Sequence, residues 1–384
     1  MNLSRVSAVI AKEWAELVRD RLFLILAFFV PPGLMLVFGF GMNMDVENIP
    51  FVIVDYDRTP MSRDYAYRYI DSRYFDFKGY IINEHEIDTM IGRNDIRAAI
   101  IIPENFSKHL SDGRRVSVQT IIDGMIPLRA KITMGYVAAI NGYFTREVLS
   151  NHLSRFLGKP PESVFGMLMP VDLEMRYMYN QGLKSVWSMA PKLIMLLLMM
   201  IPPLLTAVGV VREKERGSIL NIYGSSVSRG EFLVGKVSPY IFIAMINGLV
   251  LWAMALWIFG APFEGSMLFF LVALMIYAAC TAGIGLLVSV FVSSQIAAIV
   301  VTMIVSLIPS MLYSGILIPL SSMGPAAQAL AYLAPAMHFA KIVDGCFLKG
   351  VGPTVLWGPL LALGVYATVL FTLGYSLFTK RPKV

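Results

Sequence analysis

The first group of residues that could do chemistry is a near match to a phosphate-binding loop. Gly230 and Gly235 enclose four residues and are followed by Lys236, the pattern of a glycine-rich loop that cradles nucleotide phosphates. Val237 stands where such a loop needs a serine or threonine to bind Mg²⁺, and no predicted strand leads into the glycines. We therefore reject the match, and we expect the chain to bind no nucleotide, cofactor or metal ion of its own.

Two aspartates form the next candidate site. Asp55 and Asp57 are separated by one residue, and a pair of carboxylates at this spacing can hold a divalent cation. They also follow a predicted strand and precede a predicted helix, where aspartates bond the backbone amides of the turn, and this interpretation is favoured. His85 and Glu86 lack a second histidine four residues on, so the helix of a zinc protease is absent.

A run of charged residues is the strongest polar feature of the chain. It follows an apolar stretch that ends at Val211, alternates in sign, and closes with two small residues: Arg212, Glu213, Lys214, Glu215, Arg216, Gly217 and Ser218. Consecutive charges of this kind cannot lie in hydrocarbon, so the pattern predicts a membrane exit and a loop, 212–231, on one face. The alternating signs suit the first turns of a short surface helix, and two glutamates among cations favour contact with another protein.

The composition indicates which kind of protein must position these residues. Of 384 residues, 57% are hydrophobic and only 15% are charged, whereas a soluble domain is about half apolar and a quarter charged. We conclude that this is an integral membrane protein. Its net charge of +6 requires no nucleic acid partner, because Lys and Arg flanking membrane segments give the same excess. The 2 cysteines are too few for a disulfide framework.

Hydrophobic segments of spanning length lie at the start and in the second half of the chain. Residues 1–21 have apolar side chains at helical spacing, which predicts an interfacial amphipathic helix with Trp14 at headgroup depth. Residues 22–44 predict a first transmembrane helix, kinked at Pro31 and Pro32. Residues 185–384 hold five further segments of spanning length, at 186–211, 232–259, 268–291, 296–318 and 355–378.

The segment between the first two spans has the pattern of a folded domain. In residues 45–184 predicted helices alternate with strands expected at 51–54, 80–82, 98–102 and 116–122, which implies a compact α/β domain. The predicted fold is therefore a membrane bundle of six transmembrane helices with an inserted α/β domain.

Residues 320–350 are too apolar for a free loop and too often interrupted by prolines for a span. Three polar residues lie among their apolar ones: His338, Lys341 and Asp344. Because irregular backbone at membrane depth must be covered by protein, we predict a re-entrant helical hairpin before the last span. These three residues are candidates to line a translocation path or to belong to this hairpin.

Few polar residues lie inside the predicted spans. Asn247, Thr302 and Ser306 line a path or form hydrogen bonds between helices, and the sequence leaves both interpretations open. Lys192 lies near the outer end of the second span, where its long side chain is expected to reach the interface.

Basic residues predict the orientation. Lys and Arg cluster before the first span, around the charged loop and at the C-terminus, whereas the loop at 261–266 carries a single glutamate. Since cytoplasmic loops carry the excess of Lys and Arg, we expect both termini and the charged loop in the cytoplasm. The α/β domain then lies on the outer side.

Several groups of residues resemble a known family. The charged run of 212–218, Gly235 with Lys236, and Ser314 and Gly315 with Pro319 are similar to the permease subunit of bacterial type-2 ATP-binding-cassette (ABC) exporters. The resemblance covers the whole chain. A further set of positions resembles the subgroup with a large extracytoplasmic domain between the first two spans: Asp55, Asp57, Ile102, Pro103 and Phe106.

The resemblance implies a function and partners. The chain would be the transmembrane subunit of an exporter in the bacterial inner membrane, forming the translocation path without being an enzyme. In the family the charged loop carries a coupling helix that docks on a separate ATPase, which binds ATP and Mg²⁺; the matching residues are Arg212, Glu213, Lys214, Glu215, Arg216 and Gly217. The other implied partners are a second permease copy or paralogue, a periplasmic adaptor and membrane lipid. The competing hypothesis is a membrane scaffold or receptor that acts through its outer domain and transports nothing.

Overall fold

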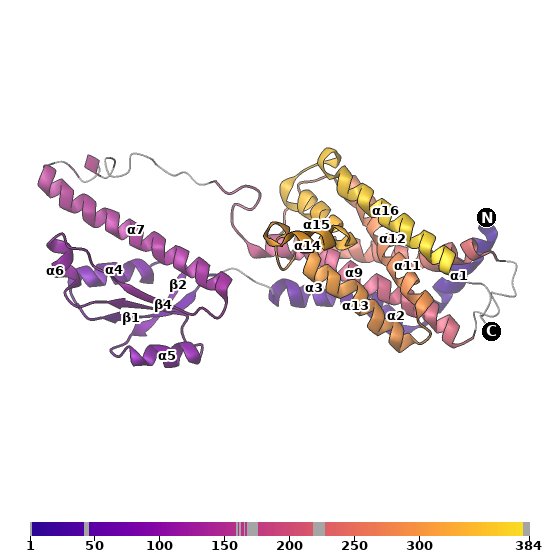
Figure 1. Ribbon diagram of the computed structural model, residues 1–384, viewed down its shortest axis with the longest axis horizontal. Coiled ribbons are helices and arrows are strands. Elements are labelled where there is room, and N and C mark those ends of the chain that lie inside the picture. The colour runs from indigo at the N-terminus through magenta and orange to yellow at the C-terminus, as the bar shows by residue number, and fades with distance from the viewer. Residues whose placement is uncertain are drawn as a thin grey trace. The chain divides into compact units, whose positions relative to one another are not determined.

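Six helices in the described part of the chain are long and apolar enough to cross a membrane: Arg21–Gly41, Ser185–Glu215, Arg229–Trp257, Met267–Phe291, Gln295–Tyr313 and Pro353–Leu377. The computed structural model describes residues 2–41, 46–158, 160, 163–164, 166, 176–217 and 227–378. Two compact units make up the chain (Figure 1). Unit 1 comprises Met1–Met44 with Tyr177–Val384 and holds all six of these helices, and unit 2 comprises Asp45–Arg176. The six predicted spans are thus confirmed by length and composition.

Unit 1 is built around α9 (Ser185–Glu215). In its most apolar stretch 83% of the residues are buried, against 11–67% in the other five helices, as expected for a helix that is hydrophobic on every side. Its main neighbours are α11 (Arg229–Trp257), α12 (Met267–Phe291) and α13 (Gln295–Tyr313). A Cβ atom on Gly285 of α12 would stand 2.2 Å from the Pro203 carbonyl oxygen, so this close approach requires glycine.

The first span is irregular near its start. It consists of α2 (Arg21–Leu24), a π-helical turn η1 (Ile25–Phe29) and α3 (Val30–Gly41). The kink at Pro31 and Pro32 stays a prediction, and the wide turn lies just before these prolines. Prolines lack the N–H donor that continues an α-helix, and a π turn accommodates the altered hydrogen-bond ladder.

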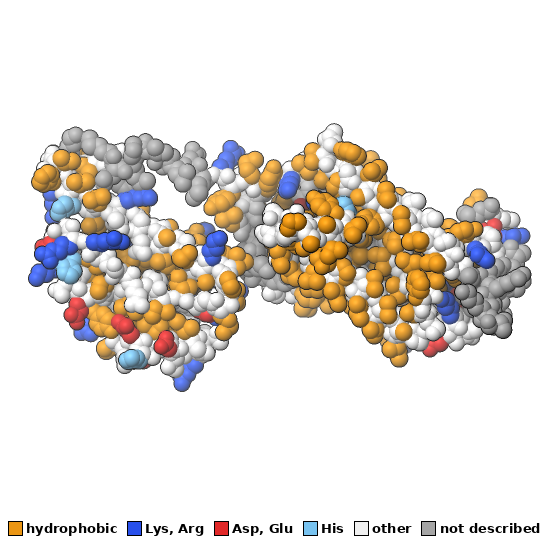
Figure 2. Space-filling model, viewed as in Figure 1, with side chains coloured by type: hydrophobic (Ala, Val, Ile, Leu, Met, Phe, Trp, Pro, Cys, Tyr) orange, Lys and Arg blue, Asp and Glu red, His pale blue; other side chains and the backbone are white. Residues whose placement is uncertain are grey.

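The segment predicted as a hairpin contains two short helices. After η2 (Leu320–Ser322), α14 (Pro325–Tyr332) and α15 (Pro335–Asp344) each begin with proline at the first helical position, and η3 (Gly345–Lys349) leads on to α16 (Pro353–Leu377). Most of α15 is buried against α9, α12 and α16. Figure 2 shows hydrophobic side chains over the face of unit 1 on which α13 and α16 lie, a surface suited to lipid or to another apolar partner.

Unit 2 contains a four-stranded sheet in the order β2-β1-β3-β4. Strands β1 (Ile49–Asp55), β2 (Phe75–Tyr80) and β3 (Ala98–Ile102) are parallel, and β4 (Gln119–Ile122) runs antiparallel to β3. One face packs on α4 (Pro60–Ile70), α6 (Phe106–Ser111) and α7 (Pro127–Leu157), and the other on α5 (His85–Gly92), as Figure 1 shows. Buried apolar residues therefore lie on both faces of the sheet, as is typical of parallel strands.

The position of β2 was predicted wrongly. The sequence placed a strand at 80–82, but β2 occupies Phe75–Tyr80. Phe75 and Phe77 alternate with Asp76 and Lys78, and both rings pack against Phe51 of the neighbouring β1. This alternation is the period of a strand with one buried face. Unit 2 also ends at Arg176, so residues 177–184 belong to unit 1 and not to the segment that the sequence assigned to the α/β domain.

Candidate functional site

The charged run forms the last turn of α9. Four charged residues continue the helix without a break: Arg212, Glu213, Lys214 and Glu215. Gly217 follows at a φ of +70°, the left-handed conformation that ends many helices. The helix thus extends to Glu215, beyond the position where the sequence placed the start of a loop. Residues 218–226, which include Ser218 and much of that loop, lie outside the described residues.

Glu213 points into unit 1 and away from solvent. Its side chain is only 4% exposed, and its Oε1 atom lies 2.7 Å from Lys12 Nζ on α1 (Leu3–Arg19) and 3.1 Å from Lys236 Nζ on α11. A buried carboxylate is costly unless cations or hydrogen-bond donors surround it. Two ammonium groups from two other helices meet this need, so Glu213 joins α9 to α1 and α11.

Lys236 connects Glu213 to a second buried carboxylate. The Lys236 Nζ atom lies 2.5 Å from Glu13 Oε2 on α1, and both side chains are 1% exposed. Tyr240, one turn further along α11, donates its hydroxyl to Glu13 Oε1 at 2.5 Å. Charge-assisted hydrogen bonds of this length are the strong kind. We refer to Lys12, Glu13, Glu213, Lys236 and Tyr240 as the charge cluster.

Gly235 explains how α1 comes close enough to form the charge cluster. A Cβ atom at Gly235 would stand 2.7 Å from the Cβ of Val9 on α1, closer than real side chains approach. The missing side chain lets α1 lie directly on α11, with Glu13 beside Lys236. Gly235 and Lys236 were rejected above as part of a phosphate-binding loop. Gly235 instead marks the point where α1 crosses α11, and Lys236 is the buried cation that follows it.

Arg212 extends the contacts of α9 to the junction between α1 and α2. Its Nη1 atom lies 2.5 Å from Asp20 Oδ2, and Asp20 also accepts the backbone N–H of Phe23 at the start of α2. Partial burial acts to raise the pKa of Asp20, but the Phe23 amide and the Arg212 guanidinium outweigh it and hold this pKa below its ordinary value. Asp20 is thus a helix cap and an ion-pair partner at once.

The remaining charges of the turn contact two more helices. Lys214 Nζ donates to the carbonyl oxygens of Ser289 and Val290 at the C-terminal end of α12, where the helix dipole favours a cation. Glu215 Oε2 accepts a hydrogen bond of 2.8 Å from the Gln295 side chain at the start of α13. One helical turn of α9 therefore bonds to α1, α11, α12, α13 and the start of the first span.

The pKa values of the α1 groups follow from this environment. Burial raises the pKa of the Glu13 carboxyl, although Lys236 and Tyr240 act to lower it. Burial acts to lower the pKa of Lys12, but the hydrogen bond and charge of Glu213 outweigh it and this pKa is raised. The Lys12 ammonium is therefore charged at neutral pH, as its ion pair with Glu213 requires.

Three carboxylates at this place are close enough to share a metal ion. Oxygen atoms of Glu13, Glu16 and Glu213 lie within 4.8 Å of one another. Lys12 and Lys236 already form ion pairs with all three, and a divalent cation beside two ammonium groups would be repelled. The arrangement suits a buried ion-pair network.

An open depression lies next to the charge cluster. Its volume is 660 Å³, and it is lined by Leu22 and by seven charged residues from the end of α1, the start of α2 and the end of α9: Glu16, Arg19, Asp20, Arg21, Arg212, Glu213 and Arg216. Arg216 is exposed. A concave surface of mixed charge is thus present where the charged run meets the N-terminal helix.

The polar residues predicted to line a path lie on two helices. Asn247 on α11 is 2% exposed, and Thr302 and Ser306 on α13 are fully buried. The Ser306 hydroxyl bonds the Thr302 carbonyl of its own helix at 2.7 Å. Asn247 Nδ2 and Thr302 Oγ1 have no hydrogen-bond partner within the described residues. These contacts include no hydrogen bond from one described helix to another, so the path-lining interpretation stays a prediction.

The three polar residues of α15 lie in two different places. His338 Nε2 is 3.0 Å from the Tyr332 carbonyl oxygen, and Lys341 lies over the Tyr332 ring at 4.8 Å. Asp344 Oδ2 is 3.3 Å from Lys192 Nζ on α9. The expectation that Lys192 reaches outward to the interface was wrong, because a carboxylate on α15 pairs with it inside unit 1.

Asp55 and Asp57 form the predicted turn. Asp55 Oδ1 accepts the backbone N–H groups of Asp57 and Arg58 at 3.1 and 3.0 Å, and Asp55 Oδ2 accepts the Ser62 hydroxyl at 2.8 Å. Asp57 Oδ2 accepts the Thr59 hydroxyl at 2.6 Å. The turn interpretation is confirmed, since the carboxylate oxygens are used to start α4.

Sequence reasoning missed the α1 side of the charge cluster. Glu13 was not among the site residues predicted from the sequence, yet it is buried with Val6 and Leu17. A signal was available, because Glu13 stands three residues after Ile10 and four before Leu17, on the apolar stripe. A carboxylate on such a stripe indicates a buried cationic partner.

A family model described as "ABC-2 family transporter protein" matches residues 21–376. The chain belongs to the ABC-2 transporter family. It is 28% identical over 382 residues, 99% of this chain and 98% of the relative, to "Probable multidrug ABC transporter permease YbhS" of Escherichia coli (strain K12). It is 26% identical over 380 residues, 98% of this chain and 99% of the relative, to "Probable multidrug ABC transporter permease YbhR" of the same organism. "Inner membrane transport permease YhhJ" of that strain is 24% identical over 336 residues, 86% of this chain and 85% of the relative.

Family membership decides between the functional hypotheses. The permease is the multi-pass transmembrane subunit of an ABC exporter, and the scaffold or receptor hypothesis is not favoured. ATP hydrolysis belongs to a separate ATPase subunit, so the permease is not itself an enzyme, and the family implies a dimeric arrangement.

Proposed function

We propose that the charge cluster transmits ATP-driven movement from the ATPase subunit to the membrane helices. The observation that carries this proposal is that one turn of α9 bonds four other helices through Glu213, Lys214 and Glu215. A displacement imposed at this turn must either break buried ion pairs or move the attached helices together. Because breaking a buried pair costs about 3–5 kcal/mol, concerted movement is favoured.

The roles of the charged residues divide by exposure. Glu213 is buried and acts as a transmitter, whereas the exposed arginines that line the depression contact the ATPase: Arg19, Arg21 and Arg216. In this proposal Arg212, Lys214 and Glu215 hold the turn to the bundle, and Gly217 ends the helix. ATP and Mg²⁺ are bound by the ATPase, and the depression with both termini lies in the cytoplasm.

Two variants on one turn test this division of roles. The permease is co-expressed with its ABC ATPase subunit, and ATPase retention and hydrolysis rate are measured in proteoliposomes. For Arg216→Glu we expect reduced retention of the ATPase. For Glu213→Gln we expect normal retention with hydrolysis reduced about tenfold or more, since the Gln cannot pair with Lys12 and Lys236.

Glu264→Gln is the matched control, because it makes the same chemical change at an exposed site between α11 and α12, outside the charge cluster and the depression. We expect near-normal retention and hydrolysis for it. Thermal unfolding of each variant shows that the bundle is intact. Normal hydrolysis by a folded Glu213→Gln permease would reject the transmitter role and leave the cluster a structural contact.

For the transport function, we propose that the permease exports drug-like molecules. The relatives YbhS and YbhR are both named as probable multidrug transporter permeases. The support from this chain is the set of buried polar groups on α11 and α13, Asn247 and Thr302, that lack partners within the described residues. We also propose that the α14–α15 pair enters the membrane from the outer side, with His338, Lys341 and Asp344 near its covered face.

We also propose partners for the permease and an orientation in the membrane. A second permease copy or paralogue and membrane lipid cover the apolar faces of α13 and α16, and unit 2 faces outward, where a periplasmic adaptor binds it. Cysteine labelling tests the orientation, since native Cys280 and Cys346 are buried. A cysteine at Ser111 should react with a membrane-impermeant reagent in intact spheroplasts, and one at Ser7 only after lysis. The reverse pattern would invert the assignment.

A further inference from the structure

A groove in unit 2 lies between α7 and the segment that follows α6. Its volume is 670 Å³, within the range of about 300–1,000 Å³ typical of small-molecule sites. Its lining comes from α4, from α6 with the chain that leads to β4, and from α7. All lining residues belong to unit 2, so the groove is complete within one unit.

The groove has an aromatic and aliphatic side. The rings of Tyr65, Phe106 and Phe144 pack on one another, with centroids 4.9 Å apart for Tyr65 and Phe144 and 6.1 Å apart for Phe106 and Phe144. Leu110 and Val148 extend this apolar lining. Such a surface binds the hydrocarbon or aromatic part of a ligand.

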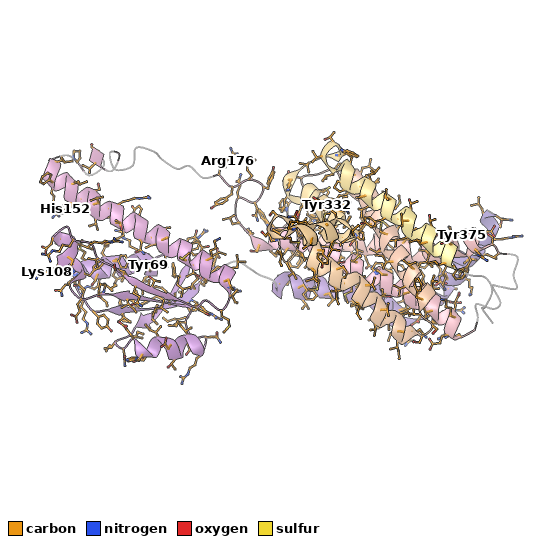
Figure 3. The ribbon with its side chains drawn as sticks, in the orientation of Figure 1. Tyr69, Lys108, His152, Arg176, Tyr332 and Tyr375 are labelled. Carbon is orange, nitrogen blue, oxygen red and sulfur yellow. The ribbon has the colours of Figure 1, made fainter. Side chains whose placement is uncertain are left out.

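Asn141 supplies a hydrogen-bond donor to the same groove. Its Oδ1 atom accepts the hydroxyls of Tyr65 and Tyr69, the latter at 3.3 Å, and the two hydroxyls are 3.0 Å apart. These contacts fix the orientation of the carboxamide. Its Nδ2 atom, which donates no hydrogen bond within the described residues, is then the part of this lining side chain left for a ligand. Tyr69 is labelled in Figure 3.

The edge of the groove is cationic. Arg114, Arg115 and His152 line it, and none of its lining residues is acidic. Neither arginine forms an ion pair within the part of the chain that the structure describes. Figure 2 shows Lys, Arg and His side chains gathered at the end of unit 2 where α6 and the C-terminal end of α7 lie, and Figure 3 places Lys108 and His152 there.

We propose that this groove binds a small anionic amphiphile, a molecule with an apolar body and one carboxylate, sulfonate or phosphate group. The aromatic side takes the apolar body, and the donors of Asn141, Arg114 and Arg115 take the anion. Charge-assisted hydrogen bonds from arginine favour an oxyanion over a neutral or cationic head group. The proposal concerns ligand binding in unit 2 and is independent of the transmission role of the charge cluster.

Photolabelling of the full-length permease tests the proposal. The protein is placed in nanodiscs of zwitterionic lipid and labelled with decanoate or decylamine that carries the same diazirine in the chain. The labelled sites are mapped by peptide mass spectrometry. We expect decanoate to label the groove segments 106–118 and 141–152. Decylamine should label them about fivefold less, because the two probes differ only in the sign of the head group.

Two double variants separate the groove from general surface charge. Arg114→Ala with Arg115→Ala should reduce decanoate labelling of these segments about fivefold, as expected for two rim charges. Arg63→Ala with Arg93→Ala removes the same charge from exposed positions outside the groove and should leave labelling unchanged. Thermal unfolding of each variant confirms that unit 2 is intact.

The source of the ligand is distinguished by adding phosphatidylglycerol to the nanodiscs. Displacement of decanoate from the groove segments identifies a lipid head group, and unchanged labelling identifies a free amphiphile; both outcomes support an anion site. Equal labelling by the two probes, or labelling unaffected by loss of Arg114 and Arg115, would overturn the proposal. Absence of label from both segments would also reject it and make an acidic segment of a protein partner the next candidate.

Discussion

The two ends of α9 are held by lysine–carboxylate contacts of different construction. Near its start Lys192 pairs with one carboxylate, Asp344, at 3.3 Å, with side chains 17% and 29% exposed. Near its end Glu213 and Glu13 share Lys236, which is 1% exposed, with Lys12 and Tyr240 completing the group. The two places are 21 residues apart, about 32 Å at about 1.5 Å per residue.

The difference lies in how many partners each charge has. Asp344 Oδ1 has no hydrogen-bond partner among the described residues, so Lys192 and Asp344 are joined by a single contact. Opening this contact leaves no third charged residue without its partner. Removing Lys236 from the charge cluster deprives two buried carboxylates, Glu13 and Glu213, of the cation that they share. The cluster end of α9 is therefore expected to move as one body with its neighbours, while the Lys192 end can separate.

The largest effect is expected from Lys236→Met. Glu13 and Glu213 would lose the cation that they share, and breaking a buried network of this kind costs about 3–5 kcal/mol of unfolding free energy. The measurement is denaturation of the purified permease in detergent. Lys12→Met is the matched control, because the Lys12 side chain is 45% exposed and its ion pair should contribute about 1 kcal/mol or less. Equal losses for both variants would remove the distinction between a buried and a peripheral cation.

A smaller loss is expected from Gly235→Ala. The new Cβ would stand 2.7 Å from Val9 Cβ and push α1 away from α11, and overpacking of this kind costs about 1–3 kcal/mol. Val9→Ala in the same chain should restore part of the stability. Gly358→Ala on α16 is the control, since nothing lies within 4 Å of its added methyl group. Unfolding in detergent measures all three, and a Gly235→Ala permease as stable as the control would contradict close packing at this crossing.

The Lys192 pair should contribute less than the cluster. A double-mutant cycle of Lys192→Met and Asp344→Asn is expected to give a coupling free energy of about 1–2 kcal/mol, between the values for exposed and buried pairs. The same cycle on Lys236→Met and Glu13→Gln provides the comparison in one set of unfolding experiments. A larger coupling at Lys192 than at Lys236 would reverse the contrast between the two ends of α9.

The smallest effect concerns pH and Asp20. Its folded-state pKa is lowered below the ordinary 3.8, so its contribution to stability is present above 3.8 and is lost as the pH falls through the lowered value. At neutral pH the difference in stability between the wild type and Asp20→Asn should be about 1 kcal/mol or less, and it should disappear in acid. Melting temperatures in detergent from neutral to acidic pH measure it. A difference that grows in acid would require the opposite pKa shift.

Local patterns predicted much of the fold. Spanning segments are recognised by length and apolarity alone, and the strands β1, β3 and β4 overlap the positions expected from short apolar runs. The turn at Asp55 was also predictable, because an aspartate bonding amides two and three residues on is a local device. β2 was misplaced because its charged outward residues concealed the alternation with Phe75 and Phe77.

The charge cluster could be predicted only on one side. The charged run indicated a special role for Glu213, but its partner Lys12 lies 201 residues away in the chain. The second ion pair of the cluster, between Lys236 and Glu13, joins residues 223 positions apart. No periodicity within a helix encodes such a contact. The end of α9 was placed too early for the same reason. Consecutive charges disfavour a helix near lipid unless residues of other elements neutralise them. Those partners are visible only in three dimensions.

The sequence separation within the charge cluster also has a consequence for synthesis. Glu13 and Lys236 are 223 residues apart, so a ribosome that adds about 5–20 residues per second needs roughly 11–45 s to make the second after the first. During this interval α1 holds a carboxylate on its apolar stripe with no Lys236 to receive it. The N-terminal helix must therefore wait near the membrane surface until α11 has been inserted, and its final docking marks a late step in the assembly of each subunit.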